Sequence, residues 1–83
     1  MNNITMLQTA LDAFKKIGKD SLPFESIFDF VWDFFEETWI QTYSDKKLTK
    51  EQIMQNKRGE LYKLLTIDGN FQHLPNGNWT ILR

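Results

Sequence analysis

The feature that most constrains this chain is a turn sequence near its C-terminus, Pro75-Asn76-Gly77-Asn78, between two short apolar segments. Asn-Gly is the preferred pair for a two-residue type I′ turn, because both central positions need a positive φ. The pair therefore predicts a β-hairpin with strands Phe71–Leu74 and Trp79–Leu82. A two-residue turn sets Leu74 opposite Trp79.

Apolar residues at helical spacing predict three helices before this hairpin. The first covers about Ile4–Ile17, and a short extended link at Leu22–Phe24 follows it. The second covers about Phe24–Ile40. The third covers about Thr49–Thr66, because Thr49 and Gln52 have the spacing of a capping box.

This order predicts an α+β fold that is mainly helical. Three helices followed by a two-stranded wing is the winged-helix order, and the Leu22–Phe24 link is a candidate for a short third strand. With 83 residues there is room for one domain, and we assign residues 1–83 to it. A hydrophobic share of 41%, of which aromatic residues are an unusually large part, indicates a packed core.

The second predicted helix has a wider apolar arc than one core face requires. Phe34 lies among the residues at the centre of this arc, and Phe30, Trp32 and Trp39 lie on its flanks. Either the helix is buried on several sides, which we favour, or the tryptophans form an exposed patch for a protein partner. The aromatic residues of this segment are the candidates for partner contact: Trp32, Trp39, Phe30 and Tyr43.

Several chemistries are excluded or disfavoured by composition. Without cysteine there are no disulfides or thiolate metal sites, and one histidine, His73, is too few for most zinc sites. No pair of groups suited to acid–base catalysis stands out, so we expect no catalytic residue, metal or cofactor and no enzyme activity. No apolar run is long enough to span a bilayer and no signal peptide is evident, so a cytoplasmic, non-membrane protein is expected.

Charge is unevenly distributed along the chain. Residues 1–42 carry three lysines against seven acidic residues, whereas residues 43–83 carry seven basic against four acidic residues. The asymmetry either orients the domain on a partner or is a solvated dipolar surface, which we favour.

The third predicted helix is the element that would read DNA in a winged helix. The polar residues in and before this helix are the candidates for DNA contact: Lys46, Lys47, Lys50, Gln52, Gln55 and Lys63. Lys57 and Arg58 lie nearer the apolar side, where their stems are expected to follow the core edge. Because DNA affinity comes mainly from phosphate neutralisation, and residues 71–82 contain no Lys or Arg, direct DNA binding is disfavoured.

The C-terminal third resembles a known family. Leu61-Tyr62, then Leu65-Thr66-Ile67-Asp68-Gly69-Asn70-Phe71, Trp79 and Leu82-Arg83, is similar to the HARE-type helix-turn-helix pattern. The resemblance runs from about residue 7 to residue 83 and is greatest to the N-terminal domain of the RNA polymerase delta subunit. The family pattern matches residues that serve as structural positions, and none of them is catalytic: Tyr62, Leu65, Ile67, Asp68, Gly69, Phe71 and Trp79.

The resemblance implies a non-catalytic accessory domain that docks on core bacterial RNA polymerase, a nucleotidyltransferase complex, and modulates transcription specificity and recycling. We expect the domain to be monomeric. The family's acidic tail is not in this sequence, the stretch between Phe24 and Met54 is longer, and Arg58 replaces an apolar residue. This hypothesis predicts that Trp39→Ala weakens docking without unfolding the domain. The alternatives are a sequence-tolerant DNA-binding winged-helix regulator and an interaction module with another partner.

Overall fold

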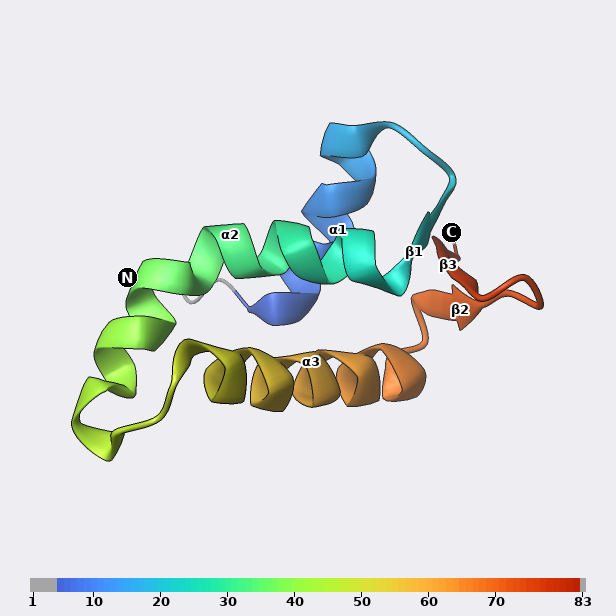
Figure 1. Cartoon of the computed structure of the whole chain (residues 1–83). Helices are drawn as coiled ribbons and strands as arrows, with labels where there is room; N and C mark the ends of the chain where they lie inside the picture. Colours follow the sequence, from blue (N-terminus) through green and yellow to red (C-terminus); the bar gives the residue numbers. More distant parts are fainter. Residues whose placement is uncertain (1–4, 83) are drawn as a thin grey trace.

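The computed structural model describes residues 5–82 and has the expected α+β composition, with helices and one antiparallel sheet. Figure 1 shows α2 and α3 side by side in opposite directions, with α1 running across α2 and the sheet at one end. The elements follow in this order: α1 (Met6–Ile17), β1 (Ser21–Pro23), α2 (Phe24–Thr42), the 3-10 turn η1 (Ser44–Lys46), α3 (Lys50–Ile67), β2 (Phe71–His73) and β3 (Asn78–Ile81).

Two of the helices begin at capping boxes. The predicted box of α3 is confirmed, since the Thr49 side chain accepts from the Gln52 backbone and the Gln52 side chain accepts from the Thr49 backbone. A second box at Thr5 starts α1, whereas the expected start at Ile4 lies outside the described residues. Helix α2 continues two residues beyond its predicted end, to Thr42.

The sheet has the strand order β1-β3-β2, with both pairings antiparallel. The predicted third strand is therefore confirmed, although it covers Ser21–Pro23 rather than residues 22–24. Leu22 of β1 pairs with Trp79 of the central strand β3. Proline in β1 is compatible with its place at the edge of the sheet, where a missing N–H costs no ladder bond. Strand β1, which lies between α1 and α2, thus pairs with β3 near the C-terminus.

The predicted hairpin is present, but its turn type and register are corrected by the structure. Lys47 is the only non-glycine residue with a positive φ among residues 5–82, so Asn76 cannot occupy a type I′ position. Instead the Gly77 N–H donates to the Leu74 carbonyl, which closes a turn with Pro75 at its second position. Proline's fixed φ suits that position, and Gly77 follows with a φ of 92° in the manner of a G1 bulge.

This three-residue loop shifts the pairing by one residue relative to the prediction. Trp79 pairs with His73 rather than with Leu74, and Phe71 pairs with Ile81. Because side chains alternate across a strand, a one-residue shift changes which residues share a face. As a result Phe71 and Trp79 lie on the same face of the sheet and both contribute to the core. His73, which pairs with Trp79, shares that face but is exposed.

Two glycines are expected to respond to alanine in opposite directions. Gly77→Ala places a side chain at a positive φ and is expected to lower the free energy of unfolding by about 1 kcal/mol. Gly59→Ala removes an exposed helical glycine and is expected to raise it by about 0.5–1 kcal/mol. Beyond the adjoining backbone, neither added Cβ meets an atom of the described structure within 4 Å, so the backbone conformation decides both signs. In urea unfolding, the midpoint should fall for Gly77→Ala and rise for Gly59→Ala. Midpoints that shift in the same direction would contradict the assigned turn.

The core lies between the three helices and one face of the sheet. Its largest fully buried side chains are Trp79, Phe28 and Ile27, and residues from every helix and every strand contribute to it. Helix α1 adds Ala10, Ala13 and Phe14, and the Phe14 and Phe71 rings are 6.3 Å apart.

Candidate functional site

The two tryptophans of α2 belong to the core. Trp32 is 5% exposed and Trp39 is 8% exposed. Their rings lie 5.6 Å apart, and the Trp39 ring stacks on Phe35 at 4.8 Å. The exposed-patch alternative is therefore wrong, and burial of α2 on more than one side is correct. The reason is that α3 lies along the flank of α2 that carries both indoles.

The other two partner candidates are half-buried. Phe30 and Tyr43 both pack against the core cluster. The exposed aromatic side chain of α2 is instead Phe34, at 54%, with Ile40 near it in sequence at 38%. The helical wheel placed Phe34 among the buried residues, and this expectation is wrong. No local signal distinguishes Phe34 from Ile27, which lies seven residues earlier on the same helix face and is 0% exposed.

A lysine is enclosed between two aromatic rings where α3 meets the end of α2. The Lys57 ammonium lies 5.0 Å from the Trp39 ring centroid and 5.3 Å from that of Tyr43. It also donates to a Glu60 carboxylate oxygen at 3.1 Å, and its side chain is only 12% exposed. Burial opposes the charged form, but the Tyr43 hydroxyl and the Glu60 carboxylate outweigh it and raise the pKa of Lys57. The predicted placement of its stem along the core edge is confirmed.

The raised pKa of Lys57 links this cluster to alkaline stability. A lysine whose folded pKa exceeds its unfolded value stabilises the fold below that unfolded value, which is about 10.5. The contribution should disappear as pH rises through the folded pKa. We therefore expect the stability difference between wild type and Lys57→Met to be constant from pH 8 to 10 and to shrink above pH 10.5. Urea unfolding at each pH measures it; a difference that grows with pH would contradict the cluster.

Arg58, the other cation beside the core, covers the face of an aromatic ring. Its guanidinium carbon is 4.7 Å from the Phe28 ring centroid, and a terminal nitrogen donates to Glu25 at 3.0 Å. Its buried Nε has no hydrogen-bond partner among residues 5–82. The cation–π contact and ion pair explain how arginine is accommodated at this position. Through both contacts, Arg58 is bound to residues of α2.

The six candidates for DNA contact do not form one free basic surface. Lys50 forms an ion pair with Glu36 at 3.2 Å, and the Lys46 ammonium lies 5.8 Å from the Tyr43 ring centroid. The Gln52 side chain is used in the capping box. Exposed Lys47, Gln55 and Lys63 have no such contact within the described part of the chain. Lys47 precedes α3, and Lys63 lies about 20 Å further along at the 1.5 Å rise of a helix.

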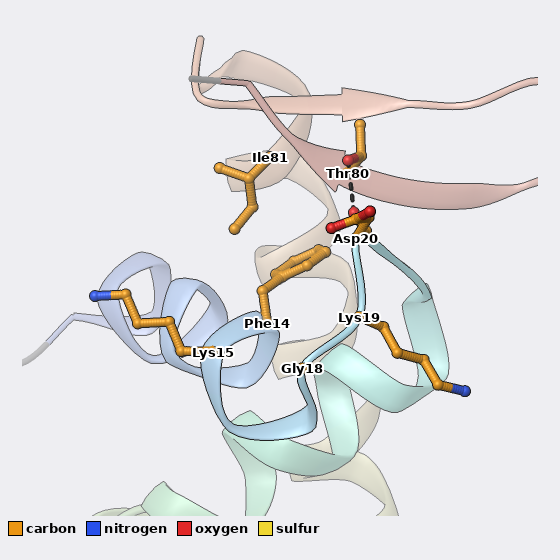
Figure 2. A pocket seen from close by; sticks show the side chains of 7 residues that line it. All are labelled: Phe14, Lys15, Gly18, Lys19, Asp20, Thr80 and Ile81. Atoms are coloured by element: carbon orange, nitrogen blue, oxygen red, sulfur yellow. Dashed lines mark hydrogen bonds between the residues drawn. The ribbon is translucent and has the colours of Figure 1, made fainter.

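The hairpin and the groove beside it add little positive charge. A shallow groove between the end of α1 and β3 is lined by Lys15, Lys19 and Asp20 together with uncharged residues. Figure 2 shows the two ammonium groups pointing away from one another, and Thr80 donating to the Asp20 carbonyl at 2.6 Å. The cations therefore do not converge on an anion. His73 is an exposed strand residue as expected, and stacks on Trp79 at 4.6 Å.

Neither a metal cluster nor a membrane-spanning helix is found in the part of the chain that the structure describes. Residues 5–82 contain no group of three or more His, Cys, Asp or Glu side chains placed to hold a metal ion. None of the helices within the same range combines the length and the apolar character needed to traverse a bilayer.

Comparison with known proteins identifies no relative of this chain: no family model, curated protein or solved structure matches it.

Proposed function

We propose that this chain is a non-catalytic winged-helix binding domain of the delta-subunit type, which docks on core bacterial RNA polymerase. The sheet carries the proposal. In a winged helix, a strand between the first two helices joins the C-terminal hairpin, and here β1 pairs with β3 to give the order β1-β3-β2. Two positions of the resemblance also support it, since α3 ends at Ile67 and Trp79 is buried in the central strand.

A protein partner is supported over DNA by the distribution of charge. Lys50 and Arg58 are both paired with acidic residues of α2, and the hairpin has no Lys or Arg. A duplex-binding domain needs several uncommitted cations on one surface to release counterions. Exposed Phe34 and Ile40 offer an apolar contact, of the kind found in protein interfaces. A surface of this kind suits a protein better than a phosphate backbone.

The test is retention of core RNA polymerase on the immobilised domain at micromolar concentration. Retention is expected, and no retention would overturn the polymerase assignment. A binding isotherm on duplex DNA at two salt concentrations tests the DNA-binding alternative. Affinity that falls steeply with salt would favour that alternative, because phosphate contacts release counterions. Absent or salt-independent binding would contradict the DNA-binding alternative.

A further inference from the structure

The C-terminal half of α2 has a face that the rest of the fold leaves open. Ile27 and Phe34 share one side of the helix, yet Ile27 is 0% exposed and Phe34 is 54% exposed. In Figure 1 the end of α2 extends past α1, the element that crosses its first half. Ile40, at 38% exposure, adds a second apolar side chain to this half of α2.

The same half of α2 is negatively charged. Helix α2 contains five acidic residues and no Lys or Arg. Two of the five are neutralised by α3, since Arg58 contacts Glu25 and Lys50 contacts Glu36. Asp29, Asp33 and Glu37 are exposed and have no ion pair among residues 5–82.

This arrangement is unfavourable for the isolated helix. Asp29, Asp33 and Glu37 follow one another at intervals of four residues, and like charges at this spacing destabilise a helix. Glu37 also lies in the C-terminal half of α2, toward the negative end of the helix dipole. The row therefore lowers helix stability without any compensating contact in the described fold. A partner that carries positive charge would relieve the repulsion.

We propose that Asp33, Phe34, Glu37 and Ile40, the acidic-apolar face of α2, bind a positively charged amphipathic segment of another protein. Apolar side chains of that segment cover Phe34 and Ile40, while its Lys or Arg residues lie opposite the two carboxylates. The inference rests on the proposed role as a protein-binding module and adds the surface and the chemistry of the partner.

The charge of the face also argues against the other occupants. Nucleic acid and anionic lipid would be repelled by Asp33 and Glu37. A second copy that placed the same face against itself would bring acidic rows together, because a two-fold interface pairs like with like. A basic amphipathic segment is not subject to this charge repulsion.

The probe is a synthetic amphipathic helical peptide of leucine and lysine, compared with a leucine–glutamate peptide of equal length. The leucine–lysine peptide is expected to bind and to shift backbone amide NMR signals chiefly in residues 33–42. The leucine–glutamate peptide is expected not to bind. Absence of lysine-peptide binding, or shifts centred on another element, would overturn the proposal. So would concentration-dependent shifts of the same residues without peptide, since these would assign the face to a second copy.

Matched variants separate the face from general attraction to an acidic protein. Phe34→Ala is expected to weaken peptide binding about tenfold, and Asp33→Asn with Glu37→Gln several-fold, with a smaller salt dependence. The controls are Ile17→Ala, which also removes an exposed apolar side chain, and Asp12→Asn with Asp45→Asn, which also removes two exposed charges. Equal losses in test and control variants would overturn the proposal.

A stability measurement tells a binding role from a structural one. Asp33→Asn removes two like-charge contacts and is expected to raise the Tm by about 2–5 °C while weakening peptide binding. A lower Tm would mean that Asp33 supports the fold and would overturn its proposed role. Because this series contains no polymerase, peptide binding without polymerase retention would overturn the polymerase assignment alone, and the reverse outcome would overturn the α2 face alone.

Discussion

Trp79→Ala is expected to lower the free energy of unfolding by about 3–5 kcal/mol, the range found for large core aromatic residues. Trp79 is 2% exposed and lies in the central strand, between Leu22 of β1 and His73 of β2. Its ring meets Tyr62 of α3 edge-on at 5.8 Å, so one side chain joins the sheet to a helix. A domain of this size has a total stability of about 4–12 kcal/mol, and much of it would be lost.

Urea unfolding followed by circular dichroism measures this loss. Trp79→Phe keeps an aromatic ring and is expected to retain more of the stability than the alanine variant. His73→Ala removes the exposed ring that stacks on Trp79 and is expected to lower the free energy of unfolding by less than about 1 kcal/mol. A Trp79→Ala midpoint close to that of His73→Ala would show that the indole does not join the sheet to α3.

Trp39→Ala is expected to lower the free energy of unfolding by about 3 kcal/mol, because the buried indole organises the end of α2. The substitution removes the stack on Phe35 and one of the two rings beside the Lys57 ammonium. It also leaves a cavity next to Trp32. This expectation replaces the one from sequence, in which the same substitution leaves the fold intact.

The loss should be concentrated where α2 meets the start of α3. Hydrogen exchange is expected to accelerate most in residues 35–43 and in the first turns of α3, with smaller changes in the sheet. Trp39→Phe, which preserves a ring at this position, is the matched control and should lose less stability. Unchanged unfolding combined with lost polymerase retention would contradict the buried role and return Trp39 to the surface candidates.

Much of the secondary structure could be predicted because its signals are local. The capping box at Thr49 and Gln52 acts within a single helical turn, and α3 begins where it predicts. The end of α3 at Ile67 and the extended link at Leu22 also depend on neighbouring residues. The hairpin lies where the sequence predicts it, but Pro75 takes the second position of the turn, and the predicted register is therefore wrong by one residue.

The candidate site could not be predicted to the same extent, because exposure depends on which elements meet. Periodicity gives the angular position of Trp39 and Phe34 around α2. It does not give which other helix packs against α2 at the point along its axis where each residue lies. Helix α3 covers Trp39, and the crossing of α1 leaves Phe34 open. Likewise, the charges of Lys50 and Arg58 are visible in sequence, but their pairing with Glu36 and Glu25 is not.

The sequence by itself determined the three helices, the hairpin and the aromatic character of the core, because periodicity, caps and turn residues act over a few neighbouring positions. It also determined that α2 is acidic and that the hairpin carries no Lys or Arg. Only the tertiary structure decided that Trp32 and Trp39 are core residues and that Lys57 is enclosed between rings. It also decided that Phe34 faces outward beside acidic residues without an ion pair among residues 5–82. Burial and ion pairing are contacts between distant parts of the chain, so they exist only once α1, α2 and α3 have packed together.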